Sequence, residues 1–315
     1  MAGPIPAARR GMLAAVVVCV VWVGSPAAGA VIPVGVLTTP RDEILPAGNT
    51  NIFLSSQNGA AHPHLYTEYV QRGASSFGPG PRIRVNAIGT QGFSGSPSGP
   101  TSSPELIYQQ VKGRQSDIKF FENGVRWNPP PGVNTPAWEY RPSASGAWIL
   151  FGRLKASTHR RKIILFDRYS QRVILLADRP AGPRGNPSAT PGEVNGNYAV
   201  WTQCTATACN VWEYDIATAT RTRLPNATPG HYNYAPSVDT AGTVYFAHGG
   251  RTCGGARIEK HPLGGAASIV WSLRPHRDVT SSFFANHFDF TPPSLLYARY
   301  GCTTGSNDVY FIQNP

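Results

Sequence analysis

The sequence predicts an all-β protein made of repeated antiparallel sheets. Its apolar residues come in short runs that are rich in β-branched and aromatic side chains and are bounded by Gly, Ser, Asp or basic loops. None of these runs reaches helical length, and none shows the three-four apolar spacing of an amphipathic helix. The unit is plainest in residues 142–176, where Trp148–Phe151, Lys162–Phe166 and Arg172–Leu176 predict three strands joined by two turns.

This unit recurs along the chain. Six anchor motifs carry two or three apolar residues that end in, or flank, an aromatic residue: Ile52-Phe53-Leu54, Leu106-Ile107-Tyr108, Ile149-Leu150-Phe151, Ala199-Val200-Trp201, Val244-Tyr245-Phe246 and Leu295-Leu296-Tyr297. Their aromatic residues recur every 43–55 residues, and a period of roughly 40–50 residues with several strands per repeat is typical of propeller blades. We therefore predict a six-bladed β-propeller with blades near residues 41–88, 89–133, 134–187, 188–228, 229–275 and 276–315.

Each anchor motif marks the second strand of its blade. First strands are expected at Glu43–Leu45, Gln91–Ser94, Ala137–Arg141, Pro191–Val194, Pro236–Asp239 and His287–Phe290. Third strands are expected at His64–Val70, Asp117–Phe121, Lys162–Phe166, Asn210–Tyr214, Ala256–Lys260 and Asp308–Ile312. Fourth strands follow at Arg82–Val85, Val125–Trp127, Arg172–Leu176, Thr220–Leu224 and Ser268–Leu273. Asp167 and Asp215 open D-x-x-S/T turns, where an Asp side chain accepts backbone N–H bonds two residues on.

One repeat also resembles a known family. The segment Ala137-Trp-Glu-Tyr-Arg-Pro-Ser-Ala-Ser-Gly146, followed by Trp148–Phe151, is similar to the TolB-type propeller repeat, whose hallmark is P-x-W-S-P-D-G before an apolar strand. Ser145-Gly146 stands where that family has Asp-Gly. The likeness covers most of the mature chain in periodicity and is specific over one or two blades. It implies a β-propeller, from a family of binding modules, rarer enzymes and scaffolds for envelope complexes.

The two ends of the chain are expected to pair. The last repeat stops after its third strand, and a sheet edge left open exposes a row of unpaired N–H and C=O groups. Val31–Leu37 is an apolar, strand-like segment that precedes the first repeat. We predict that residues 31–39 supply the fourth strand of the last blade and so close the ring.

The N-terminus predicts export. Arg9 and Arg10 precede an apolar run from Met12 to Val23, and Ala28-Gly29-Ala30 offers a small-x-small cleavage site, so residues 1–30 have the pattern of a secretory signal peptide. An uncleaved anchor is the alternative, although the run is short of the about 20 residues that span a bilayer. The twin arginine leaves the Sec and twin-arginine routes both open. Residues 31–315 are expected to be one soluble, monomeric domain in the cell envelope or outside the cell.

Charge points to anionic partners. The formal net charge is +11, and +9 without Arg9 and Arg10. A basic balance favours acidic glycans, wall polymers or lipid headgroups, although it can also serve solubility alone. An envelope protein is the further candidate partner. Nucleic acid fits the charge, but the chain has no nucleic-acid-binding motif. No Walker loop, dinucleotide glycine pattern or nucleophile elbow is present, so no cofactor is expected.

Four cysteines remain after the signal peptide, an even number that predicts disulfides in an exported protein. All four lie in loops between second and third strands. Of the three connectivities, we predict Cys204 with Cys209 across one hairpin end and Cys253 with Cys302 across the last two blades. Zinc binding is the alternative for Cys204 and Cys209, but no Cys-x-x-Cys motif or nearby His pair completes a site.

The candidate binding residues gather on one side. Connections from second to third strands, and from fourth strands to the next blade, share one face of a propeller blade, and here they are the long ones: Gly152–Arg161, Asp178–Gly192, Pro225–Ala235 and Arg274–Asn286. Function commonly lies on loops that a rigid scaffold positions. Arg and Tyr suit anionic or sugar-like ligands, and the predicted ligand-binding residues are Arg153, Arg160, Arg161, Arg184, His231, Tyr232, Tyr234 and Arg277.

We therefore predict a secreted binding module that uses this basic face. The alternative is an extracellular carbohydrate-active hydrolase or lyase, because Glu43, Glu139, Glu193, Asp239 and Asp289 fall on predicted inner strands and glycosidases need two carboxylates about 5–10 Å apart. Inner-strand polar residues also commonly do no more than solvate a narrow channel.

Overall fold

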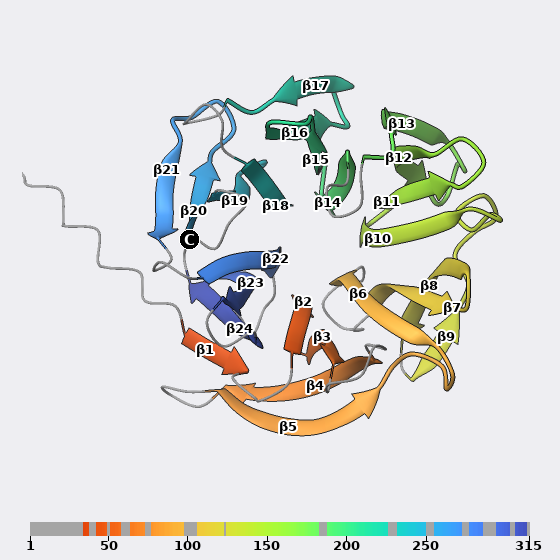
Figure 1. The fold of residues 1–315 in the computed structure, drawn as a ribbon, viewed down its shortest axis with the longest axis vertical. Coiled ribbons are helices and arrows are strands. Elements are labelled where there is room, and N and C mark those ends of the chain that lie inside the picture. Colours follow the sequence, from red (N-terminus) through yellow and green to blue (C-terminus); the bar gives the residue numbers. More distant parts are fainter. Residues whose placement is uncertain are drawn as a thin grey trace, which may run out of the picture. The chain divides into compact units, whose positions relative to one another are not determined.

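A computed structural model of the chain describes residues 34–37, 42–48, 51–57, 64–72, 77–97, 106–122, 124–182, 188–225, 232–249, 255–272, 277–285, 294–302 and 306–313. These residues form β-strands joined by turns and short connections (Figure 1). Among them, no helix has the length and apolar character that crossing a membrane requires. The expected all-β class is confirmed.

Strand pairing arranges the chain in four-stranded antiparallel meanders. The first comprises β2 (Asp42–Gly48), β3 (Asn51–Gln57), β4 (His64–Arg72) and β5 (Phe77–Arg84). The second comprises β6 (Gln91–Pro97), β7 (Leu106–Lys112), β8 (Gln115–Glu122) and β9 (Val125–Trp127). The third comprises β10 (Trp138–Ser145), β11 (Trp148–Lys155), β12 (Arg160–Asp167) and β13 (Val173–Pro180).

The pattern continues to the end of the chain. The fourth meander comprises β14 (Ala189–Asn195), β15 (Tyr198–Cys204), β16 (Cys209–Asp215) and β17 (Thr220–Arg223). The fifth comprises β18 (Tyr232–Val238), β19 (Val244–Gly249), β20 (Ala256–His261) and β21 (Ser268–Ser272). The last contains β22 (Arg277–Ala285), β23 (Ser294–Gly301) and β24 (Ser306–Gln313), and its fourth strand is β1 (Val34–Leu37) from the other end of the sequence.

Two parallel bridges join meanders into larger sheets. Trp138 of β10 pairs with Ser116 of β8, and Tyr232 of β18 pairs with Cys209 of β16. Each bridge is a single residue pair, so the resulting eight-stranded sheets are pairs of meanders that touch at one corner. The first strands lie nearest the middle of Figure 1 and each contacts the first strand of the next meander, with β2 also contacting β22.

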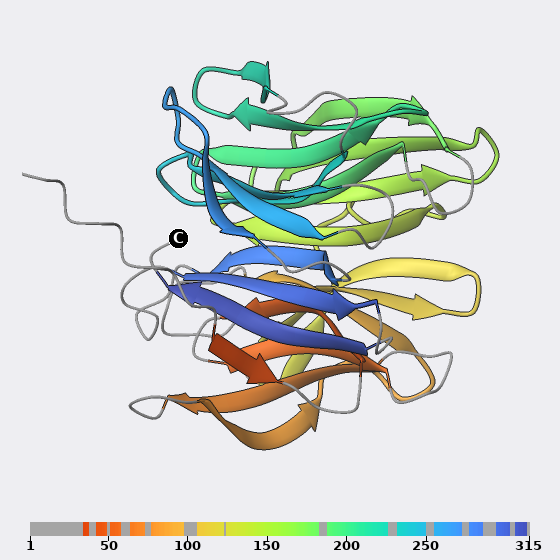
Figure 2. The same ribbon diagram turned by 60° about the vertical axis from the view of Figure 1, so that its left-hand side comes forward.

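β1 lies beside β24 in both ribbon views (Figures 1 and 2). The pairing is antiparallel, with Val34 opposite Phe311 and Gly35 opposite Tyr310. This is the pairing that the sequence predicts for the segment before the first repeat.

The anchor motifs explain how neighbouring meanders pack. In the third meander, Phe151 is buried in a cluster with Ile107 of the second meander, whereas Leu150 is buried in a cluster with Trp201 of the fourth. The anchor motif of the fourth meander also packs on both sides. Trp201 is buried with Leu150 of the third meander, and Val200 is buried with Phe246 of the fifth. Successive side chains of a strand point to opposite faces, so one three-residue motif fills the core on both sides of its sheet.

A β-bulge in five first strands is a second repeated feature. In each, two residues lie opposite one residue of the anchor motif, and the bulged pairs are Leu45-Pro46, Gly95-Ser96, Arg141-Pro142, Gly192-Glu193 and Ala235-Pro236. Arg141 and Ala235 have left-handed backbone conformations, with φ of 46° and 50°. A bulge bends its strand and re-aims a side chain, so each first strand is kinked beside its anchor motif.

The predicted Asp turns are confirmed. Asp167 Oδ1 accepts hydrogen bonds from the backbone N–H groups of Tyr169 (2.9 Å) and Ser170 (3.3 Å). Asp215 Oδ1 accepts the equivalent bonds from Ala217 (2.9 Å) and Thr218 (3.3 Å). Both carboxylates therefore shape the tight turns between third and fourth strands.

Three expectations about strand limits are wrong. The expected loop Gly152–Arg161 is mostly strand, because β11 runs to Lys155 and β12 begins at Arg160. The expected loop Arg274–Asn286 contains β22, which is the first strand of the last meander, and the first strand expected at His287–Phe290 lies outside the described residues. Asp239 lies after the end of β18, in a turn where its Oδ1 accepts N–H bonds from Ala241 and Thr243. The sequence predicts loops at these charged strand ends because charged residues are depleted in strands.

Candidate functional site

Six cations collect at one end of the third meander, around the short turn between β11 and β12. Because this turn has only four residues, the cations lie on strand ends and not on a loop. We call this group the basic strand end; it consists of Arg153, Lys155, Arg160, Arg161, Lys162 and Arg179. Two carboxylates, Glu139 and Asp178, lie among them.

The register sets like charges directly opposite one another. Lys155 pairs with Arg160, and Arg153 pairs with Lys162. Arg161 pairs with Arg179 of β13. Like charges that are directly opposed across two strands are destabilising. The arrangement therefore costs stability in the absence of a counter-charge.

Arg153 is held by its neighbours. Its Nε donates to Glu139 Oε1 at 2.8 Å, and its Nη2 donates to the carbonyl oxygens of Gly132 (2.9 Å) and Val133 (2.8 Å). Glu139 is fully buried and also accepts a bond from Thr135 Oγ1 at 2.7 Å. Burial raises the pKa of Glu139, partly offset by Thr135 and the Arg153 guanidinium. Arg153 is thus committed to neutralising a buried carboxylate.

Arg160 and Arg161 have more open surroundings. Arg160 Nε donates to Asp178 Oδ1 at 2.6 Å, in an ion pair whose side chains are 42% and 29% exposed. The Arg161 guanidinium lies 5.3 Å from the centre of the Tyr140 ring. That ring is fixed, because Tyr140 donates to the carbonyl of Ala189 and fills the space that a Cβ at Gly152 would occupy. Stacking on a fixed aromatic ring holds the flat Arg161 guanidinium in place, and its Nε is buried without a hydrogen-bond partner among the described residues.

The other predicted ligand-binding residues are less completely placed. Tyr232 and Tyr234 are partly buried on β18, and Tyr234 packs against a core cluster that contains Tyr245. Arg277 begins β22 opposite Gly301, and its side chain is not among those described. Arg184 and His231 lie outside the described residues. Tyr232 and Arg277 are the first residues of β18 and β22. Trp138 has the same position in β10, the first strand of the meander that carries the basic strand end.

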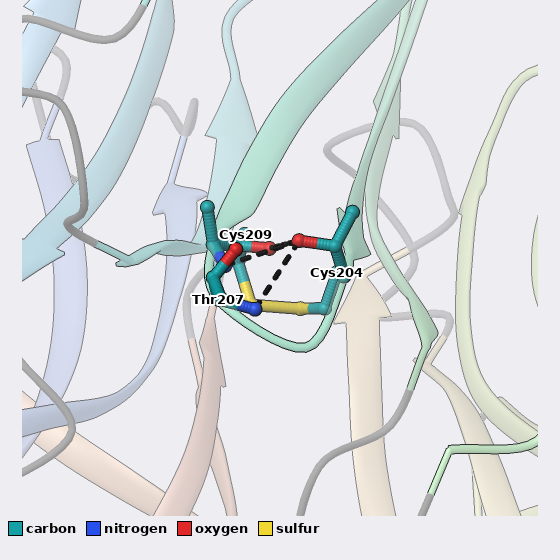
Figure 3. The surroundings of a disulfide bond; sticks show 5 residues. Cys204, Thr207 and Cys209 are labelled. Carbon is teal, nitrogen blue, oxygen red and sulfur yellow. Dashed lines mark hydrogen bonds between the residues drawn. A yellow bond between two sulfur atoms is a disulfide. The ribbon is translucent and has the colours of Figure 1, made fainter.

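One predicted disulfide is confirmed. Cys204 and Cys209 are bonded, with a Cα–Cα distance of 4.0 Å, at the end of the β15–β16 hairpin (Figure 3). Thr205 Oγ1 caps the enclosed turn by accepting the N–H of Ala208 at 3.1 Å. Cys302 is also disulfide-bonded, and Cys253, its predicted partner, lies outside the described residues.

The acids expected on inner strands have structural partners where their side chains are described. Glu193 lies in the bulge of β14, and its Oε2 accepts bonds from Ser237 Oγ and from the N–H of Val238 at 3.3 Å. It therefore ties β14 to β18. Glu139 is paired with Arg153, and Asp239 shapes a turn. The side chains of Glu43 and Asp289 are not among those described.

A layer of buried ionisable side chains lies between the fourth and fifth meanders, and the sequence does not predict it. Strand alternation places Glu213 of β16 on the face that carries Val200, and Glu259 and His248 on the face that carries Phe246, and these two faces pack together. Arg257 Nε donates to Glu259 Oε1 at 2.7 Å, and His261 Nε2 lies 3.4 Å from Glu259 Oε2. No group of three potential ligands suited to a metal ion occurs within the described part of the chain.

The two carboxyls in this layer have opposite electrostatics. Burial raises the pKa of Glu213 to about 7, with a further contribution from the negative charge of Asp215. Its Oε1 is buried without a hydrogen-bond partner. Burial acts in the same direction on Glu259, but hydrogen bonds from His261 and Arg257 and the nearby positive charges outweigh it, so its pKa is lowered. The available sequence signals are the alternating patterns E-x-D at Glu213 and Asp215 and R-x-E-x-H from Arg257 to His261.

Antiparallel four-stranded meanders in sequence order, with first strands inside and fourth strands outside (Figure 1), are the arrangement of a β-propeller. No family model matches the chain, and no curated protein matches it.

Solved structures of similar fold are distant in sequence. The chain is similar to TolB from Acinetobacter baumannii, with 11% identity over 87% of this chain and 63% of that one and a TM-score of 0.46. It is similar to oligogalacturonate lyase from Vibrio parahaemolyticus, with 7% identity over 90% and 82% of the two chains and a TM-score of 0.48. The Dos1 propeller gives 7% identity over 83% and 65%, with a TM-score of 0.44. The chain thus spans less than two thirds of the TolB chain.

Proposed function

We propose that this protein is an exported, six-bladed β-propeller that binds an anionic glycan, wall polymer or acidic envelope protein through the basic strand end. The pairing of β1 with β24 and the contact of β2 with β22 support a closed ring. Closure would give a rigid platform, and binding residues on rigid elements are positioned more accurately than those on free loops.

The observation that carries the proposal is the opposition of like charges. Six cations surround one strand end, three cross-strand pairs are cation against cation, and two carboxylates are present to offset them. Each such pair costs a few tenths of a kcal/mol or more. An anionic ligand removes this repulsion on binding, so the stability lost in the free protein is regained in the complex.

The disulfide supports export. Disulfides persist in oxidising compartments and are rare in the cytosol, and Cys204–Cys209 is formed. Together with the signal-peptide pattern of residues 1–30, this favours a location in the envelope or outside the cell.

Binding can be measured on the full mature chain, residues 31–315, with hyaluronate as a carboxylated glycan and polyphosphate as a phosphate polymer. The test variant is R161Q/R179Q, which removes one opposed pair. Exposed charge contacts are worth about 0–1 kcal/mol each, so we expect a roughly three- to thirtyfold loss of affinity at low salt. The melting temperature should stay the same or rise, because the repulsion between the two arginines is gone.

The matched control is R168Q/R172Q, which removes two cations from the opposite, tight-turn end of the same meander. It should leave the affinity unchanged. If both double variants weaken binding equally, binding follows net charge alone and the proposed face is wrong. If neither polymer binds the unmodified protein at 50 mM NaCl, the proposal also fails.

A further inference from the structure

Arg141 has a backbone conformation that is unusual for a residue with a side chain. It is the first residue of the β10 bulge and has a φ of 46°. Residues other than Gly seldom take a positive φ, because the Cβ then crowds the backbone and strains it. The corresponding bulge residues of the other described first strands are Leu45, Gly95, Gly192 and Ala235. Arg141 is thus the charged residue of this set.

A buried hydrogen-bond relay from the second meander fixes this bulge. Ser116 Oγ donates to the carbonyl of Glu139, and Gln109 Nε2 donates to Ser116 Oγ at 2.9 Å. Gln109 Oε1 then accepts the backbone N–H of Arg141 at 3.3 Å. Gln109 and Ser116 are both buried. A buried network whose members are all hydrogen-bonded holds one backbone geometry. The relay therefore fixes the backbone of Arg141.

The guanidinium of Arg141 has no anionic partner among the described residues. Its backbone N–H donates to Gln109 Oε1, and within the described part of the chain no group accepts a hydrogen bond from its guanidinium. The nearest carboxylate in sequence, Glu139, is already paired with Arg153 and Thr135. The side chain is partly buried, and loss of solvent lowers the pKa of the guanidinium. A desolvated cation is costly unless it is paired.

The bulge lies toward the middle of the fold. β10 pairs with β11 on one edge, and on its other edge it has one bridge, Trp138 with Ser116. Beyond that bridge, no described strand pairs with the inner edge of β10, and β6 and β14, the first strands on either side, both contact β10. First strands lie nearest the middle of Figure 1.

We propose that Arg141 binds an oxyanion group, a carboxylate or a phosphate, at the inner edge of β10. Arg suits this role because its planar guanidinium donates two parallel N–H bonds to such a group. The site is separate from the basic strand end and does not depend on it.

The experiment compares anion-induced stabilisation in three versions of the mature chain. Thermal unfolding is followed with succinate as the carboxylate probe and inorganic phosphate as the phosphate probe, each titrated at constant ionic strength with chloride. The unmodified protein should show a saturable rise in melting temperature with at least one probe, and the better probe identifies the anion class. R141G should lose tenfold or more in affinity for that probe, because charge-assisted bonds are worth about 1.5–3 kcal/mol.

Stability of the free variants separates binding from folding. R141G relieves the positive φ, so without anion it should melt at the same temperature as the unmodified protein or higher. A235G relieves the same strain at the equivalent bulge and should keep full anion binding. R141K keeps the positive charge but cannot donate two parallel N–H bonds, so it should bind the anion with intermediate affinity.

The proposal is wrong if neither probe shifts the melting temperature of the unmodified protein, or if R141G responds to both as the unmodified protein does. It is also wrong if R141G melts much lower without anion, since Arg141 would then be a structural residue. R161Q/R179Q should respond to the small anions normally, which keeps this result distinct from the test of the basic strand end.

Discussion

Neutralising Glu213 should stabilise the protein, and the size of the effect follows from its surroundings. The second and third meanders place Phe120 and Leu165 at the position that Glu213 occupies in the fourth, opposite the middle residue of the anchor motif. Glu213 is 6% exposed, and its pKa is raised from 4.5 to about 7 by burial and by Asp215. A carboxyl thus occupies an apolar core position.

The sign of the pH dependence follows from this direction. Because the folded-state pKa is above the unfolded one, ionised Glu213 destabilises the folded protein. The cost is small below pH 4.5, grows between pH 4.5 and about 7, and is complete above that range. One pKa unit corresponds to about 1.4 kcal/mol, so the full cost is about 3 kcal/mol. His248, His261, Arg257 and Glu259 of the facing meander lie in the same layer, and they are the same residues in the unmodified protein and in a Glu213 variant.

The assay is denaturant unfolding of the mature chain and its E213Q variant at pH 4.5 and pH 8. We expect E213Q to be more stable by about 3 kcal/mol at pH 8 and by less than about 0.5 kcal/mol at pH 4.5. E213L, which copies Leu165, should behave similarly. Equal stability of E213Q and the unmodified protein at pH 8 would refute the reasoning, as would a gain that is the same at both pH values.

The remaining predictions use the same unfolding measurements. E259Q should destabilise the protein at pH 7, and the difference should shrink as the pH falls below 4.5, because the pKa of Glu259 is lowered and its stabilising charge is lost on protonation; a more stable E259Q would contradict this. Deleting residues 31–39 removes the partner of β24 and should lower the melting temperature strongly; an unchanged melt would show that the pairing does not matter. C204S/C209S should cost only about 2 kcal/mol, because the closed loop is short; loss of folding would mean that the bond does more than stiffen a hairpin end.

The anchor motifs made most of the fold predictable. A short apolar run such as Ile149-Leu150-Phe151 has to bury both faces of its strand, and its recurrence every 43–55 residues leaves few alternatives to a propeller. Asp167 and Asp215 were predictable because an Asp turn is encoded by adjacent residues. The short disulfide was predictable for the same reason, since one hairpin end brings Cys204 and Cys209 together.

Features that depend on contacts between meanders were not predictable. The sequence predicts a loop at Arg160 and Arg161, because nothing local shows that β12 begins with these two cations. The φ of Arg141 depends on Gln109 and Ser116, which belong to another repeat. The missing partner of Glu213 is a property of the packed interface and has no local signal.

The salt dependence of anionic-polymer binding tests the central proposal most directly. The Debye length falls from about 10 Å at 0.1 M salt to about 3 Å at 1 M, so binding by several cations of the basic strand end should weaken steeply over this range. The slope of log affinity against log salt should be smaller for R161Q/R179Q than for the unmodified protein, and unchanged for R168Q/R172Q. A slope that both double variants reduce alike, or that neither reduces, would contradict a dedicated binding face.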